Sequence, residues 1–266
     1  MATPTDLVSI ASEASRVGGR TIVAAGRIRE GVEKGAGDYV TAVDGASERA
    51  IATFLSGASP GIPIVGEEGG GTTTDRYWLV DPLDGTTNFL HGFPIVAVSV
   101  SLVQEGRPIV GAIHAPFLGE TYAGGQGLGA SVERADGTSE RLAVSERPVE
   151  RAVVGTGFPF RRKEVLPRYA RTMLAALERF EDLRRPGAAA LDLAWVAAGV
   201  FDGFFELALG PWDVAAGAVL IREAGGVVTD WSGAADVLSG DILAGPPNVH
   251  AELLTIASST REEGGA

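Results

Sequence analysis

One short stretch, residues 77–89, limits the possible folds more than any other part of the chain. Its first four residues, Tyr77–Val80, are aromatic or branched, which predicts a strand that runs into the core. The aspartates Asp81 and Asp84 follow directly, with one proline between them and a glycine behind. Proline and glycine at these places predict a tight turn, so both carboxylates and the carbonyl of Leu83 are expected to converge. The strand therefore ends in a group of oxygen atoms.

This group of oxygens predicts a binding site beside the start of a helix. Oxygen ligands suit a hard cation such as Mg²⁺ or Ca²⁺. The backbone amides of residues 85–87 open the next predicted helix, and free N–H groups at a helix start suit a phosphate. A structural interpretation stays open for the motif alone, because Asp-Pro and Asp-Gly are common in turns and Asp84 could act only as an N-cap.

Three more carboxylates lie at the ends of other predicted elements. Glu67 and Glu68 follow the apolar residues 62–65, and Asp213 leads into an alanine-rich helix. The four candidate ligands among them are Glu67, Asp81, Asp84 and Asp213, and four carboxylates around one cleft would repel one another strongly unless divalent cations neutralised them. Such a set fits a two-metal phosphohydrolase, in which the ions polarise the phosphoryl oxygens, lower the pKa of the attacking water and stabilise the leaving alkoxide.

Residues 78–88 and 212–226 resemble the two signature motifs of the inositol monophosphatase family, a group of Mg²⁺-dependent, lithium-sensitive phosphatases. The resemblance extends over nearly the whole chain, and both motifs stand in the expected order. It implies a layered αβαβα sandwich like that of inositol monophosphatase and fructose-1,6-bisphosphatase. It also implies two or three Mg²⁺ ions per active site and a homodimer.

The resemblance implies which residues hold the metal ions. Glu67, Asp81 and the carbonyl of Leu83 are expected to bind the first Mg²⁺. Asp81, Asp84 and Asp213 are expected to bind the second. Lithium is then expected to occupy this second, weaker position.

Catalytic and substrate-binding roles follow from the same resemblance. Glu67 and Thr86 are expected to orient and activate the attacking water, and Asp44 matches an aspartate at the edge of the family's metal site. Residues 34–44 are expected to form a glycine-containing hairpin that leads into a second helix. Lys34 matches a family lysine on this hairpin, and Glu68 is a further candidate. The residues expected to contact the substrate are Asp84, Gly85, Thr86, Ala189, Glu206 and Asp213. A structural role stays open for Asp44, as a favourable charge in the first turn of its helix.

The substrate is expected to be inositol 1-phosphate, since Asn88, Phe89 and the run His91–Pro94 look like the inositol monophosphatase branch. Fructose 1,6-bisphosphate and histidinol phosphate remain the enzyme alternatives. A regulatory module that binds a partner on the same fold remains the alternative outside enzymes. The chain departs from bacterial members at Gly187–Ala189, where they often carry a hydroxyl residue in the middle, so one hydrogen bond to the substrate would be weaker. Glu206 matches the glutamate with which the family bonds inositol hydroxyls.

Composition excludes several other chemistries. The chain has no cysteine, which rules out thiolate catalysis, disulfides and Cys-ligated zinc. Its formal net charge of −12 disfavours electrostatic binding to nucleic acid or to anionic lipid. The amino terminus lacks a basic segment followed by an apolar run, and no long apolar run occurs elsewhere. We therefore expect a cytoplasmic protein whose partner is a small phosphate monoester, without membrane or nucleic acid.

Hydrophobic periodicity predicts a mixed architecture of helices and strands. A long amphipathic helix is expected over residues 7–28, with a kink at Gly18 and Gly19 as one option. Three consecutive strands are expected between residues 95 and 123, and residues 130–150 are expected to form polar turns. Because helices and strands come in blocks rather than in strict alternation, the pattern predicts a layered α+β fold.

Two domains are expected, with a boundary near residue 145. Residues 1–145 would carry Glu67 and the motif that contains Asp81 and Asp84. Residues 146–266 would carry Glu206 and Asp213.

Overall fold

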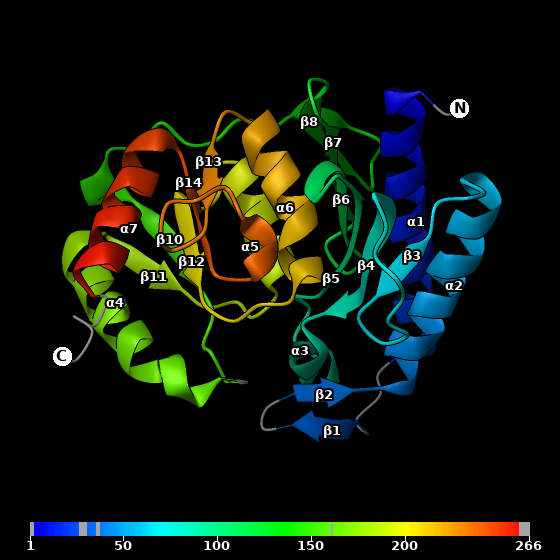
Figure 1. Cartoon of the computed structure of the whole chain (residues 1–266), viewed down its shortest axis with the longest axis horizontal. Helices are drawn as coiled ribbons and strands as arrows, with labels where there is room; N and C mark the ends of the chain where they lie inside the picture. The colour runs from blue at the N-terminus through cyan, green and yellow to red at the C-terminus, as the bar shows by residue number, and fades with distance from the viewer. Residues whose placement is uncertain (1–2, 27–30, 36–37, 161, 261–266) are drawn as a thin grey trace.

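The molecule is built from five layers that alternate between helices and sheets (Figure 1). A seven-stranded and a five-stranded sheet form the second and fourth layers, and a pair of helices fills each of the others. The structure is a computed structural model that describes residues 3–26, 31–35, 38–160 and 162–260. The layered αβαβα architecture predicted from the sequence is confirmed.

The first outer layer packs against the seven-stranded sheet. It consists of α1 (Pro4–Ala25) and α2 (Ala42–Ala58). The sheet has the order β3-β4-β5-β6-β7-β8-β9, with β3 parallel to β4 and every later pair antiparallel. Its strands are β3 (Ile64–Gly66), β4 (Arg76–Asp84), β5 (Ala97–Gln104), β6 (Arg107–Ala115), β7 (Glu120–Gly125), β8 (Gly129–Arg134) and β9 (Ser139–Arg141).

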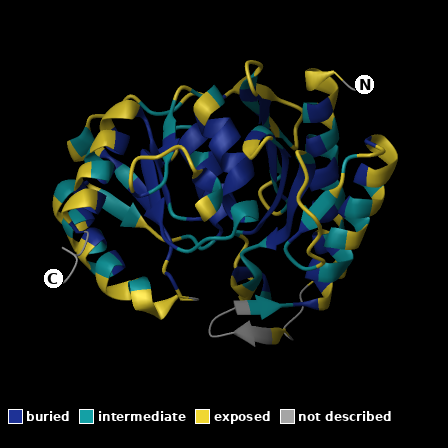
Figure 2. Cartoon of the chain, in the orientation of Figure 1, coloured by how far each residue is buried: buried dark blue, intermediate teal, exposed yellow. Residues whose placement is uncertain are grey.

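The central helix pair separates the two sheets and is buried on nearly all sides (Figure 2). It consists of α5 (Ala189–Ala197) and α6 (Pro211–Glu223). Such all-round burial explains why both helices are apolar on every face instead of amphipathic.

The five-stranded sheet lies on the other side of this pair, in the order β11-β10-β12-β14-β13, and mixes parallel and antiparallel pairs. Its strands are β10 (Val153–Thr156), β11 (Asp182–Arg184), β12 (Gly203–Glu206), β13 (Val227–Thr229) and β14 (Ile242–Gly245). The last layer consists of α4 (Leu166–Arg179) and α7 (Pro247–Ser259).

Short elements complete the described structure. The predicted hairpin is present as β1 (Val32–Gly35) and β2 (Asp38–Val40), which pair antiparallel. A short helix, α3 (Thr86–His91), follows β4. The single-turn 3₁₀ helices are η1 (Val149–Arg151), η2 (Lys163–Val165) and η3 (Val237–Ser239). None of the described helices is long and apolar enough to cross a membrane.

Two sequence expectations about secondary structure were wrong or incomplete. Residues 130–150 were expected to form turns, but β8 and β9 extend the first sheet there because their backbones pair with β7 and with each other. No element was predicted for β14 or α7, although β14 lies between β12 and β13 in the second sheet. The strands change from one sheet to the other between β9 and β10. The domain boundary near residue 145 stays a prediction.

The glycines of α1 serve close packing within a helix that continues past them to Ala25. A Cβ on Gly18 would lie 2.8 Å from side-chain atoms of Ile51 and Ser47 of α2. A Cβ on Gly19 would lie 2.3 Å from the imidazole of His114 on β6. The two positions therefore let α1 approach both α2 and the sheet.

Candidate active site

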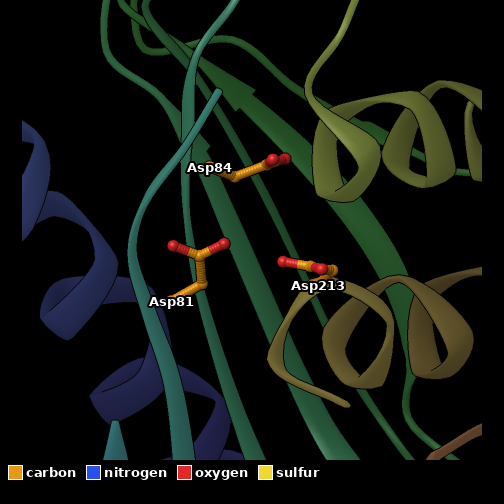
Figure 3. Close-up of side chains that lie close together, drawn as sticks. All are labelled: Asp81, Asp84 and Asp213. Carbon is orange, nitrogen blue, oxygen red and sulfur yellow. The ribbon is translucent and has the colours of Figure 1, made fainter. Parts of the chain in front are cut away.

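Three aspartates from distant parts of the chain come together at one point (Figure 3). Asp81 and Asp84 lie near the end of β4, and Asp213 lies in the first turn of α6. Each offers one carboxylate oxygen, and these oxygens lie within 4.8 Å of one another. Asp81 is 1% exposed and Asp213 is 6% exposed, so solvent does little to screen their charges.

A β-bulge in β4 brings the first two carboxylates into position. The pairing of β4 with β5 shifts register between Asp81 and Asp84, so the strand continues where a tight turn was predicted. The amide of Leu83 donates to Asp81 Oδ1 at 2.9 Å, and Ser47 Oγ donates to the Pro82 carbonyl at 2.9 Å. Gly85 then ends the strand with φ of 88°, a conformation that side chains rarely allow.

Asp84 faces the second half of the molecule. Its Oδ2 accepts a hydrogen bond of 2.7 Å from the amide of Ala190, in the first turn of α5. The nearby Asn88 donates to the carbonyls of Ile95 and Pro186, at 2.7 and 2.9 Å. These bonds fix the start of α5 against the end of β4. Asp84 is therefore not the N-cap of α3, whose N-cap is Gly85.

Asp213 is oriented by its own helix. Its Oδ2 accepts a hydrogen bond of 2.7 Å from the amide of Gly210, just before α6 begins. The helix then packs against β5 and β6 of the first sheet, and Ser99 of β5 donates to the Trp212 carbonyl at 2.9 Å. The aspartate therefore reaches the β4 carboxylates from the opposite side of the site.

Burial and mutual repulsion disfavour the ionised carboxylates. The pKa of Asp81 is raised well above its usual value, first by burial and then by the charges of Glu67, Asp213 and Asp84. The pKa of Asp84 is raised to about 7, first by burial and then by Asp213, although three amides at the start of α5 act in the opposite direction. Without a counter-charge, the cluster is therefore electrostatically unfavourable in its ionised form.

The cluster fits a hard divalent cation. All three donors are carboxylates, the ligand type that Mg²⁺ and Ca²⁺ prefer, and a bound cation would supply the missing positive charge. Oxygens bound to one octahedral Mg²⁺ lie about 3 to 4 Å apart, so the spacing within 4.8 Å requires only small side-chain movements.

A threonine links the cluster to the carboxylate of α2. Thr86 Oγ1 lies 3.1 Å from Asp44 Oδ1 and 3.1 Å from the Leu83 carbonyl. Asp44 is 1% exposed, and its other oxygen accepts from the amide and hydroxyl of Thr41, the N-cap of α2. Asp44 therefore stabilises the helix start and holds the Thr86 hydroxyl at the same time.

Glu67 lies in the turn that follows β3, and its amide donates to the Val80 carbonyl at 3.1 Å. The turn is held by Glu48 of α2, a residue that was not predicted because no local sequence pattern marks it. Glu48 Oε2 accepts from the amide of Glu68 at 2.9 Å, and Oε1 accepts from the amide of Gly69 at 2.7 Å. The turn therefore fits closely around one carboxylate from the neighbouring helix.

A cavity of about 310 Å³ opens over the cluster. Most of the residues selected from the sequence line it, namely Glu67, Asp81, Leu83, Asp84, Gly85, Thr86, Ala189, Glu206 and Asp213. Asp44 and Glu68 are not among the lining residues. Lys34 belongs to β1, and its side chain lies outside the described part of the structure. Asp192 of α5 also lines the cavity and was not predicted.

Glu206 is buried at the far side of the cavity from β4. It ends β12 and is 9% exposed, and the indole N–H of Trp231 donates to its backbone carbonyl at 2.9 Å. A Cβ on Gly157 would lie 2.1 Å from Glu206 Oε1, so a larger residue there would displace the Glu206 carboxylate. The glutamate is thus enclosed by the protein while it still borders the cavity.

Comparison with known proteins gives consistent matches over nearly the full length. The model of the inositol monophosphatase family matches residues 4–263. The chain is 44% identical over 232 residues to a protein of Pseudomonas aeruginosa named Nus factor SuhB, with 84% of each chain covered. It is 40% identical over 251 residues to the Escherichia coli protein of the same name, with 91% and 92% covered.

Solved structures give the same result. The extragenic suppressor protein suhB of Bartonella henselae superimposes with a TM-score of 0.88 at 35% identity, covering 97% of this chain and 99% of that one. An IMPase of Thermotoga maritima superimposes with a TM-score of 0.86 at 32% identity, covering 98% and 100%.

Proposed function

The chain belongs to the inositol monophosphatase family, and from this we propose that it is a Mg²⁺-dependent phosphate monoester hydrolase that releases phosphate from inositol 1-phosphate. The observation that supports the proposal best is the convergence of Asp81, Asp84 and Asp213 beside a cavity of about 310 Å³. The cavity is large enough for a small phosphate ester, and the raised pKa values of Asp81 and Asp84 favour cation binding.

The acidic residues of the site would hold the metal ions. On the proposed assignment, Glu67, Asp81 and the Leu83 carbonyl bind one Mg²⁺, and Asp81, Asp84 and Asp213 bind another. Bound Mg²⁺ would polarise the phosphoryl oxygens and lower the pKa of the attacking water. A third Mg²⁺ ion per active site would be held by the same acidic residues.

The residues around the cluster would position water and phosphate. The Thr86 hydroxyl donates to Asp44 Oδ1 or to the Leu83 carbonyl, which leaves its lone pairs to accept a hydrogen bond from the attacking water. Glu67 would accept the single proton that this water loses as it attacks the phosphorus. The amides of Gly85 and Thr86 border the cavity and would donate to the phosphate. Beyond the phosphate, Glu206 and the Ala189 backbone would contact the alcohol.

A panel of phosphate esters tests the proposal directly. Phosphate release from inositol 1-phosphate, fructose 1,6-bisphosphate, histidinol phosphate and 3′-phosphoadenosine 5′-phosphate is measured with Mg²⁺ and again with excess EDTA. We expect the highest kcat/KM on inositol 1-phosphate and no release in EDTA. Undiminished turnover in EDTA would refute the metal mechanism. A higher kcat/KM on another ester would support phosphatase activity and would identify that ester as the better substrate.

A second candidate function is a partner-binding role, which the name Nus factor suggests for relatives that are 38% to 44% identical to this chain. Exchange of the Escherichia coli suhB gene for this chain, as wild type and as Asp213→Asn, separates the two roles. Rescue of growth by both forms would support a role that does not need hydrolysis. Rescue by the wild type alone would support the enzyme. The homodimer remains a prediction.

A further inference from the structure

Asp192 is a buried carboxylate whose surroundings do not satisfy it. It lies in the first turn of α5 and is 1% exposed. Its Oδ1 is buried and has no hydrogen-bond partner among the described residues. Buried polar atoms without a partner are rare in folded proteins and disfavour the folded state. The side chain therefore needs a structural or a functional explanation.

Two structural explanations fail on the geometry. An acid in the first turn of a helix can accept from free amides there, but the amide of Ala190 donates to Asp84 instead. An arginine can neutralise a buried acid, and the charge of Arg185 does attract Asp192. The Arg185 guanidinium, however, lies over the rings of Phe158 and Phe160, 5.2 and 5.4 Å from their centroids. Asp192 is thus neither a helix cap nor held in place by that arginine.

The position of Asp192 supplies a functional explanation. It lines the same cavity as Asp84 and Glu206. Burial raises the pKa of Asp192 well above its usual value, and the like charges of Asp84 and Glu206 raise it further, which places the three carboxylates in one electrostatic environment. Asp84 marks the metal side of the cavity and Glu206 the proposed alcohol side. A ligand that occupies the cavity therefore passes next to Asp192.

The chemistry of the site limits what such a ligand offers. A carboxylate without a donor needs an O–H or N–H group, and the alcohol half of a polyol phosphate presents several hydroxyls. The neighbouring lining residues Ala188 and Ala189 have only methyl side chains, so they leave room for a ring and supply no competing side-chain donor.

We propose that Asp192 is a specificity-determining residue, which together with Glu206 accepts hydrogen bonds from the hydroxyls of a polyol phosphate. The proposal rests on the phosphatase function given above. It adds that the site selects polyhydroxylated alcohols over aromatic ones, since a phenol ring offers Asp192 no donor and would leave its carboxylate unpaired.

The test compares Asp192→Asn with a matched variant, Asp202→Asn. Asp202 is likewise buried, at 0% exposed, but it is satisfied by Arg147 Nη1 at 2.8 Å and by the amide of Val153 at 2.7 Å. For the wild type and both variants, kcat/KM is measured on inositol 1-phosphate and on phenyl phosphate. The Mg²⁺ concentration that gives half-maximal activity and the melting temperature without ligand are measured as well.

We expect Asp192→Asn to lower the ratio of kcat/KM on inositol 1-phosphate to kcat/KM on phenyl phosphate by about tenfold or more. This is the usual effect of losing a hydrogen bond to a charged group. The Mg²⁺ requirement should not change, and the melting temperature should stay equal or rise, because a buried carboxyl group whose Oδ1 has no partner among the described residues is removed. Asp202→Asn should lower the melting temperature and leave the ratio unchanged.

Three results would overturn the proposal. Equal losses on both substrates would mean that Asp192 supports the fold, as would a lower melting temperature of Asp192→Asn. A shifted Mg²⁺ requirement would mean that it supports the metal cluster. If the wild type hydrolyses neither ester, the proposed function fails. The contact between Asp192 and the polyol is then tested by binding, measured as the shift in melting temperature that inositol 1-phosphate with Mg²⁺ causes. A shift lost in Asp192→Asn would uphold its contact with the polyol, and an equal shift would refute it.

Discussion

In the metal-free protein, Asp84 should make the free energy of unfolding fall as the pH rises. Its pKa is about 7 in the folded protein against a usual value of 3.8, so the folded state holds the proton more tightly than the unfolded chain does. The resulting stability is complete below the unfolded value and is lost as the pH rises through the folded one. At about 1.4 kcal/mol per pKa unit, the loss between pH 5 and pH 8 is about 3 kcal/mol.

The variant Asp84→Asn separates this effect from titrations outside the site. His114 acts in the opposite direction, since burial lowers its pKa to about 4 and its stability contribution is lost as the pH falls. Wild type and variant share His114, so their difference at each pH reports on Asp84 together with Asp81 and Asp213, whose charges are coupled to it. In EDTA, the advantage of Asp84→Asn in free energy of unfolding should grow by about 3 kcal/mol from pH 5 to pH 8. The assay is urea unfolding followed by tryptophan fluorescence.

Two controls make the result decisive. Asp75→Asn changes an exposed aspartate outside the site and should show no comparable trend. Saturating Mg²⁺ should raise the stability of the wild type at pH 8 and remove most of the advantage of the variant, because the cation binds the folded state. A difference between wild type and Asp84→Asn that stays constant from pH 5 to pH 8 would refute the electrostatic reasoning.

Four further predictions concern activity. Asp213→Asn should abolish phosphate release while circular dichroism shows an intact fold, whereas Asp236→Asn, an exposed change, should keep activity; substantial turnover by Asp213→Asn would remove this residue from the metal site. Millimolar LiCl should inhibit steady-state hydrolysis at saturating Mg²⁺, and unchanged rates would show that the weaker metal position differs from that of the family. Glu206→Ala should lower kcat/KM on inositol 1-phosphate more than on p-nitrophenyl phosphate, since it removes a charge-assisted hydrogen bond to the alcohol. The difference should correspond to about 1.5–3 kcal/mol of transition-state stabilisation; equal losses would make Glu206 a structural residue. Glu48→Ala should raise the Mg²⁺ concentration for half-maximal activity, because two amides beside Glu67 lose their acceptor, and an unchanged Mg²⁺ requirement would contradict this positioning role.

Patterns within a short stretch predicted much of the fold. The strand before Asp81, the hairpin before α2 and the buried strand β5 follow from runs of apolar residues and from turn residues between them. The elements that the sequence did not reveal depend on distant partners. All three residues of β9 are exposed, and the strand exists through its pairing with β8. β14 is four residues long and exists through pairing with β12 and β13.

The functional site likewise contains residues that a local sequence pattern marks and residues that become visible only in the folded structure. Asp81 and Asp84 stood out because proline and glycine lie beside them, and Asp213 because it begins an apolar helix. Glu48 has no such local signal, because its partners lie 20 and 21 residues away and become visible only when α2 packs beside the turn. Asp192 is hidden for a related reason. In the sequence it is one polar residue in an apolar helix, and only its burial without a partner distinguishes it.

The contact between Asp84 and α5 explains how one carboxylate can serve both halves of the molecule. One oxygen of Asp84 accepts from the amide of Ala190, which joins the seven-stranded sheet to the central helices. In this orientation the side chain lies beside Asp213, whose charge adds to burial in raising the pKa of Asp84. The interaction that orders the two halves thus creates the repulsion that a cation relieves. Cation binding and the docking of α5 on β4 should therefore strengthen each other, since both require Asp84 in this orientation.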